Sequence, residues 1–166
     1  NFFKIKDVVL KEQHRLMPNF PYEGYFFALS EHESCITLTS KRCLDPTARL
    51  LTSKEEGAGI PQLTRTFRKD GTVKMDVLTD MVRRYNRELK ELSWKNVYKR
   101  PDLQIRAMVI LYKENYDSFM FIPNKLERVK FSDSAYNGGR GWLNKERIAC
   151  GVSKNCNPQI YSYNVE

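Results

Sequence analysis

Apolar residues recur at intervals of three and four positions through much of the chain. This period is typical of amphipathic helices, in which every third or fourth side chain lies on the same face. The pattern predicts helices over residues 8–17, 21–33, 73–92, 102–119 and 125–137. We therefore expect a mostly α-helical protein.

The predicted helix over residues 73–92 carries the longest apolar stripe. Its stripe residues, which we expect to face the core, are Met75, Leu78, Met81, Val82, Tyr85, Leu89 and Leu92. Pro18 and Pro21 are expected to end the first helix and start the second, and Pro101 to start the fourth, because proline fits the first helical turn. The polar segment over 35–57 predicts a loop, and loops of that length are often functional.

Composition limits the class of protein. With 166 residues, of which 41% are hydrophobic, the chain suffices for one compact domain over 1–166. A formal net charge of +8 predicts attraction to a polyanion, and nucleic acid, anionic lipid and acidic cell-wall polymer all fit it. No stretch approaches the roughly 18 apolar residues of a membrane span, so we expect no membrane insertion. Because the chain begins at Asn1, we expect a domain excised from a longer protein or a processed product.

The four cysteines form two close pairs along the chain, Cys35 with Cys43 and Cys150 with Cys156. Neither spacing is that of a zinc knuckle, so we expect no metal site, although zinc remains an alternative. Two local disulfides are favoured if the protein works outside a reducing cytosol. Free buried thiols are the other alternative.

Five short motifs follow one another along the chain. They are Glu33-Ser34 at the end of ALSEHES, Asp45-Pro46-Thr47-Ala48, GAGIPQLT at 57–64, Gln104-Ile105-Arg106-Ala107-Met108, and AYNGGRG at 135–141. In this order they resemble the lytic transglycosylase family, the goose-type lysozyme-like enzymes that cleave bacterial peptidoglycan. The segment after residue 141 is similar to bacteriophage members of that family. Glu56 and Pro61 depart from the family pattern, which has glycine and methionine at these positions.

The resemblance implies a mostly α, lysozyme-like fold with a substrate groove. It implies cleavage of the β-1,4-glycosidic bond between MurNAc and GlcNAc, with formation of 1,6-anhydro-MurNAc ends. Glu33 is the implied catalytic acid and base, and the implied substrate-binding residues are Ser34, Gln62, Tyr136 and Asn137. No metal or organic cofactor is implied. The implied partner is bacterial peptidoglycan, and the implied place of action is the cell wall or periplasm. We expect a virion-associated or secreted protein, with other domains of a phage virion protein or endolysin as further partners.

The chemistry itself also favours Glu33. Cleaving a glycosidic bond needs a proton on the leaving oxygen, so the acid must stay protonated near neutral pH. A glutamate beside Phe26, Phe27 and Leu29 at the inner end of an apolar helix would be desolvated, which raises its pKa. Glu31 competes for this role but faces another direction on a helix, and the family register selects Glu33.

Three other functions remain open. If water attacks in place of a substrate hydroxyl, the protein is a hydrolytic muramidase, and Glu55, Glu56 or Asp76 could position that water. A module that retains the groove without activity would only bind glycan. A basic helical nucleic-acid binder would fit the charge, but the sequence has no motif typical of that class, so we expect no nucleic-acid partner.

Overall fold

The computed structural model describes residues 2–35, 40–153 and 155–161, with side chains from residue 5 onward. The chain divides into two compact units, Asn1–Ile110 and Leu111–Glu166. The expectation of a single domain over 1–166 stays a prediction. Among the helices of the described ranges, none is long and apolar enough to cross a membrane.

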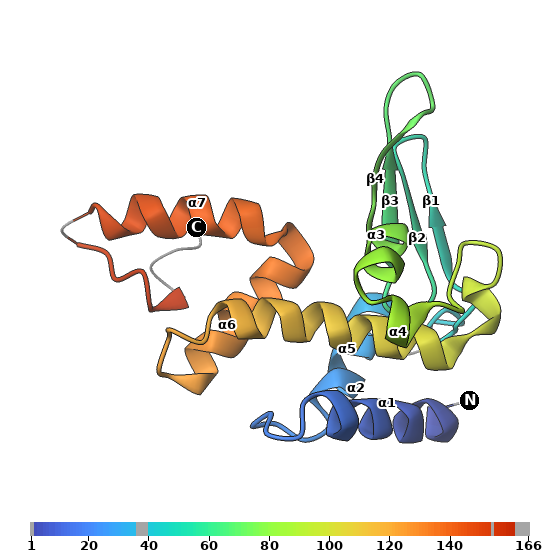
Figure 1. Cartoon of the computed structure of the whole chain (residues 1–166), viewed down its shortest axis with the longest axis horizontal. Coiled ribbons are helices and arrows are strands. Elements are labelled where there is room, and N and C mark those ends of the chain that lie inside the picture. The colour runs from blue at the N-terminus through green and yellow to red at the C-terminus, as the bar shows by residue number, and fades with distance from the viewer. Residues whose placement is uncertain (1, 36–39, 154, 162–166) are drawn as a thin grey trace. The chain divides into compact units, whose positions relative to one another are not determined.

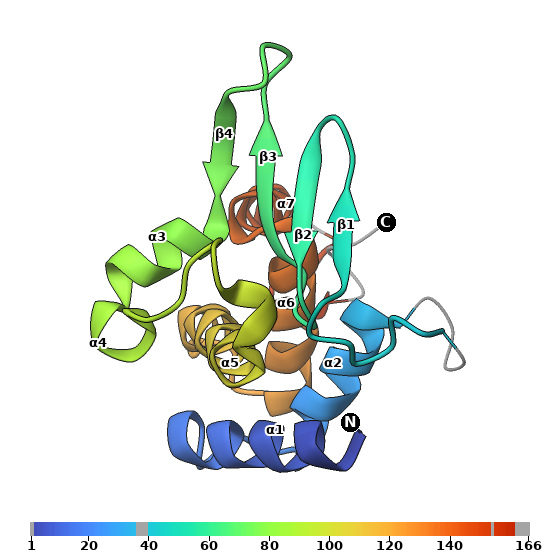
Figure 2. The same cartoon turned by 90° about the vertical axis from the view of Figure 1, so that its right-hand side faces the viewer.

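The first unit contains helices and one antiparallel sheet (Figure 1). Its elements, in order, are α1 (Phe2–Leu16), α2 (Tyr25–Ser34), β1 (Arg49–Leu51), β2 (Glu55–Ala58), β3 (Leu63–Phe67), β4 (Val73–Asp76), α3 (Val77–Arg84), α4 (Asn86–Leu89), the 3-10 helix η1 (Val97–Lys99) and the first part of α5 (Pro101–Ser118). The strand order is β1-β2-β3-β4, so each strand pairs with its neighbour in the sequence. Figure 2 shows the strands side by side, with α3 next to β4 and α2 nearer to β1.

The second unit begins with the last turns of α5 and continues through α6 (Lys125–Gly138) and α7 (Arg140–Gly151). Its core is built from Phe119, Ile122, Phe131, Ala135 and Leu143, with Tyr161 packed against it. The Arg147 guanidinium lies within 5.6 Å of three phenylalanine ring centroids, and its Nε donates to the Pro158 carbonyl. This contact fastens the segment after α7 to the core.

The expectation of a mostly helical protein is confirmed, and the structure adds a small four-stranded sheet. Helix α5 begins at Pro101, as predicted, and α6 is followed by Gly139 in the left-handed region (φ 87°). The prediction that the second helix starts at Pro21 is wrong, because α2 begins at Tyr25.

The prediction of one helix over 73–92 is wrong. Residues 73–76 form β4, which pairs with β3, and helical structure is interrupted again at Tyr85. The physical reason is Asp76, whose side chain accepts a hydrogen bond from the Thr79 amide and so caps α3 instead of lying inside a helix. Met75, expected in the core, is 49% exposed, whereas Leu78, Met81 and Leu89 are buried.

The prediction of a loop over 35–57 is wrong in part, because β1 and the start of β2 lie there. Strand β1 has only three residues, and all of them are exposed. Such a strand has no alternation of buried and exposed positions that could be detected along the sequence. Residues 36–39 of this segment lie outside the described residues.

Both cysteine pairs are disulfides, Cys35–Cys43 and Cys150–Cys156, so the alternatives of free thiols and of cysteine-bound zinc are wrong. The first bond joins the end of α2 to the segment that leads into the sheet. The second joins the end of α7 to the segment that follows it. Disulfides persist in oxidising compartments, so both are compatible with a secreted or extracellular protein.

Candidate functional site

Helix α2 delivers Glu33 from the core of the first unit to its surface. Phe26 and Leu29 anchor the helix, and Phe26 is fully buried. The Phe26 ring packs against Phe20, with 5.4 Å between ring centroids, and against Tyr25 at 5.6 Å. These aromatic contacts fix the helix, and Glu33 lies in its last turn.

The carboxyl of Glu33 is largely withdrawn from water. Its side chain is 14% exposed, and its Oε1 is buried with no hydrogen-bond partner among the described residues. His32 Nδ1 lies 3.5 Å from Oε1, on a side chain that is 72% exposed. Burial raises the pKa of Glu33, and the contact with His32 offsets this only in part. The carboxyl therefore stays protonated to a higher pH than an ordinary glutamate.

A pocket of about 320 Å³ lies in front of Glu33. Its lining comes from the end of α2, the segment before the sheet and three strands, and consists of Glu33, Ser34, Arg42, Ala48, Arg49, Leu50, Glu55, Gly57, Gln62 and Thr64. Three of the five predicted site residues, Glu33, Ser34 and Gln62, are thus brought together. Volumes of this size hold small ligands or single sugar units.

Strand register decides which side chains face the pocket. Gly57 pairs with Leu50 on one side and with Thr64 on the other, so the three lie in one row across the sheet. Side chains two positions apart on a strand share a face, so Glu55 faces the same side as Gly57. Glu56 faces the opposite side.

Glu56 is consequently an internal charge of the sheet. It is 3% exposed, and its carboxylate accepts hydrogen bonds from Arg49 Nε and Arg65 Nε, each at 2.8 Å, and from the Tyr98 hydroxyl at 3.2 Å. Burial alone would raise the pKa of Glu56, but the Arg65 and Arg49 guanidiniums outweigh it and hold the pKa below its usual range. This carboxylate stays ionised, and its oxygens are already engaged in hydrogen bonds within the protein.

The Asp76 carboxylate is also engaged in hydrogen bonds within the protein. Besides capping α3, its carboxylate accepts a hydrogen bond from Trp94 Nε1 at 2.9 Å. Of the three carboxylates suggested as water-positioning groups, Glu55 is therefore the one that lines the pocket with Glu33.

Ser34 ties α2 to the segment before the sheet. Its hydroxyl donates to the Ser30 carbonyl at 2.6 Å and accepts from the Leu44 amide at 2.8 Å. A hydroxyl has a single proton to donate, so this donor is used within the protein. With the neighbouring Cys35–Cys43 bond, Ser34 holds the pocket wall against the end of the helix. A direct contact between Ser34 and substrate stays a prediction.

The turn between β2 and β3 presents Gln62. Gly59 (φ 70°) and Gln62 (φ 48°) both have left-handed backbone conformations, and the Gln62 side-chain amide donates to the Gly59 carbonyl at 2.6 Å. This hydrogen bond uses one amide proton of Gln62. The Gln62 side chain is thereby held along the rim of the pocket.

Gln104 of α5 holds this turn from beneath. Its fully buried side chain accepts from the Ile60 amide at 2.9 Å and donates to the carbonyls of Pro46 and Val97 at 2.8 and 2.6 Å. One amide thus joins the turn, the segment before the sheet and η1, and the first two of these contribute residues to the pocket. The sequence offered one signal for this role, a glutamine inside the apolar run of α5, and only the family motif drew attention to it.

Tyr136 and Asn137 belong to the second unit, in the last turns of α6. The Tyr136 ring is half-buried, with its centroid 6.3 Å from that of Tyr112, whose hydroxyl donates to Asp133. Asn137 is exposed, and its side-chain amide donates to the Asp133 carbonyl at 3.2 Å. Their predicted roles in binding substrate stay predictions.

Comparison of the chain with protein-family models, with curated proteins and with solved structures finds no match. The site is therefore interpreted from its own geometry and chemistry.

We expect Gly59→Ala to destabilise the protein by at least about 2 kcal/mol, because a side chain at positive φ is strained and its Cβ would collide with the buried Gln104 amide. Gly57→Ala is the matched control. There the Cβ meets the end of the Gln62 side chain, which can move, so the loss should stay below about 1 kcal/mol. Urea unfolding measures both. Equal losses would contradict the proposed rigidity of the turn.

We expect Glu33→Gln to be more stable than the parent protein at neutral pH. A carboxyl whose pKa is raised on folding favours the folded state while protonated, and this contribution is lost as pH rises through the folded pKa. The advantage of the glutamine should therefore shrink as the pH falls to the usual glutamate range. Thermal unfolding between pH 3 and 8 measures this, with Glu31→Gln as control. An advantage that does not vary with pH would count against desolvation of Glu33.

Proposed function

We propose that this protein is a peptidoglycan lytic transglycosylase with a lysozyme-like fold. It would cleave the β-1,4 bond between MurNAc and GlcNAc, with Glu33 as the single acid and base. The observation that carries the proposal is a carboxyl with a raised pKa whose buried Oε1 accepts no hydrogen bond from the described residues, placed at the edge of a pocket large enough for a sugar. The five sequence motifs add the substrate class.

In the proposed reaction, Glu33 first donates one proton and then accepts one. Protonated Glu33 donates to the oxygen that leaves with GlcNAc, while the bond from that oxygen to C1 of MurNAc breaks. The C6 hydroxyl of the same MurNAc then attacks C1, and its proton passes to the Glu33 carboxylate. The product carries a 1,6-anhydro ring, and Glu33 regains its proton for the next cycle.

The pocket offers groups suited to a sugar. Leu50 supplies apolar surface, and Thr64 and Gln62 supply polar atoms on the same side of the sheet. The Thr64 hydroxyl donates to the Gln62 carbonyl, which leaves its oxygen available as an acceptor for a sugar hydroxyl. Rigid polar groups of this kind would orient the ring so that the leaving oxygen meets Glu33.

Two general properties agree with action in a bacterial cell wall. A net charge of +8 favours approach to an acidic polymer, and the two disulfides suit an oxidising compartment. We propose that the protein acts in the wall or periplasm, as a virion-associated or secreted enzyme.

Glu55 supports a second candidate, a hydrolytic muramidase acting on the same bond. Because Glu55 lines the pocket with Glu33, it could hold a water molecule for attack on C1. The product would then have a reducing end in place of the anhydro ring, and the two products differ in mass by one water.

We expect Glu33→Gln to reduce release of fragments from purified murein by at least about 100-fold, since an amide cannot donate the proton. Glu55→Gln should retain activity with an unchanged anhydro product if a substrate hydroxyl is the nucleophile. Mass spectrometry of the fragments measures both the rate and the product.

Glu31→Gln, on the same helix, is the control and should behave like the parent. A reducing end that is lost with Glu55→Gln would favour the muramidase. Murein binding without fragment release by the parent would favour a non-catalytic glycan-binding module. Full activity in Glu33→Gln would overturn the proposal.

A further inference from the structure

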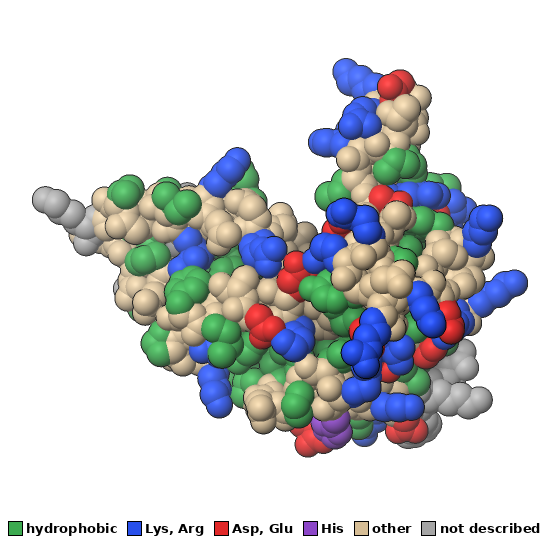
Figure 3. All heavy atoms as spheres, viewed as in Figure 1, with side chains coloured by type: hydrophobic (Ala, Val, Ile, Leu, Met, Phe, Trp, Pro, Cys, Tyr) green, Lys and Arg blue, Asp and Glu red, His purple; other side chains and the backbone are tan. Residues whose placement is uncertain are grey.

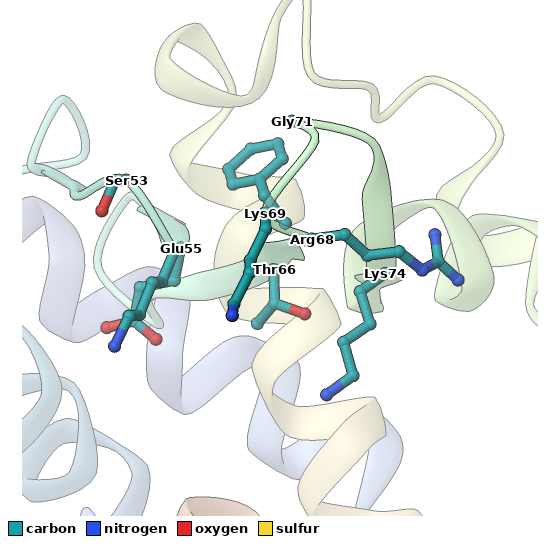
Figure 4. Close-up of a pocket in the computed structure, with 9 residues that line it drawn as sticks. Ser53, Glu55, Thr66, Arg68, Lys69, Gly71 and Lys74 are labelled. Atoms are coloured by element: carbon teal, nitrogen blue, oxygen red, sulfur yellow. The ribbon is translucent and has the colours of Figure 1, made fainter.

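A second hollow, of about 760 Å³, lies at the far end of the sheet, where the β1–β2 and β3–β4 hairpins turn. Four basic residues line it, Lys54, Arg68, Lys69 and Lys74, together with Phe67 (Figure 4). We call these five residues the basic shelf. Figure 3 shows the Lys and Arg side chains that gather around the tip of the β3–β4 hairpin.

The three lysines of the basic shelf are available to a ligand. Each is exposed, and none has an ion-pair partner among the described residues. The acid at the hairpin tip, Asp70, is turned to its own loop, where it accepts from the Thr72 amide at 3.0 Å and hydroxyl at 2.7 Å. The three lysines are therefore not held in ion pairs within the described residues, although Glu55 lines the same hollow.

Ordered turns present these cations. Arg68 donates through Nη1 to the Val73 carbonyl at 2.7 Å, which closes the β3–β4 turn. The Phe67 amide donates to the Lys54 carbonyl at 2.8 Å and so joins the two hairpins. The spacing between Lys54 on one hairpin and Lys69 on the other is thus held by the sheet.

The basic shelf adjoins the Glu33 pocket. Glu55 lines both hollows, and its partner in the sheet, Thr66, lines the second hollow together with the shelf residues. Glu55 and Thr66 lie on the pocket side of the sheet, so a polymer that leaves the pocket past them reaches the second hollow at the hairpin turns. Glu55 lies between the lysines and the pocket, and its carboxylate would repel a continuous line of phosphates. Separate anionic groups on flexible branches suit the shelf better.

We propose that the basic shelf binds the carboxylates of the peptide chains that branch from the glycan strand held in the Glu33 pocket. This inference rests on the proposed function. Lysine ammonium groups act as point charges and accept carboxylates from many directions, while Phe67 offers apolar surface to the peptide. The shelf would make peptide-bearing strands better ligands than bare glycan.

The test measures binding in a Glu33→Gln background, so that strands stay intact. The variant Lys54→Gln/Lys69→Gln/Lys74→Gln should lose about 10-fold in affinity for peptide-bearing strands at low salt. Its affinity for strands stripped of peptides by an amidase should not change. The matched control is Lys6→Gln/Lys11→Gln/Lys95→Gln, which removes the same charge from exposed positions of the first unit.

Several results would overturn the inference. They are an equal loss in the control variant, an equal loss on stripped strands, and no measurable binding of peptide-bearing strands. If the triple lysine variant lost more affinity for duplex DNA or for a phosphate-containing wall polymer than for peptide-bearing strands, the shelf would be a phosphate-binding site instead. Because the measurement needs no cleavage, a parent that binds through the shelf but releases no fragments would defeat the proposed function alone.

Discussion

Burial of the Glu33 carboxyl, with Oε1 lacking a hydrogen-bond partner among the described residues, is the constraint on which the candidate site depends. Withholding a carboxyl from water is unfavourable once it is ionised, so the surrounding structure must hold it in place. The aromatic anchor of α2 and the bonds that tie Ser34 and Cys35 to the next segment do so. Stability is given up at one side chain, whose carboxyl stays protonated to a higher pH than an ordinary glutamate.

Glu55 and Glu56 are neighbours on one strand, and their side chains point to opposite faces of the sheet. Glu56 points to the side where Arg49 and Arg65 keep it ionised, whereas Glu55 faces the pocket. Arg49, one of the two arginines that pair with Glu56, also lines the pocket, so the internal charge cluster supports the pocket wall. One rigid turn, clamped by Gln104, then sets where Gln62 lies relative to this wall.

Sequence periodicity was sufficient for α5 and α6, because each has a long apolar pattern and a clear start or stop signal at Pro101 or Gly139. It failed for the strands, which have three to five residues and depend on pairing with one another. The motifs pointed to Glu33, Ser34 and Gln62, which the structure places around one pocket, and their catalytic and substrate-binding roles stay predictions. They could not reveal the clamp by Gln104 or the different roles of Glu55 and Glu56, since both depend on contacts between distant segments.

The most direct test of the central claim is a titration of the Glu33 side-chain carboxyl by carbon-13 NMR in the free protein, with Glu33→Gln used to assign the resonance. The account predicts a midpoint above the usual glutamate value of about 4.3, because burial disfavours the charged form. A midpoint at or below that value would mean that the carboxyl is solvated or paired. Glu33 would then be ionised near neutral pH and unable to act as the acid.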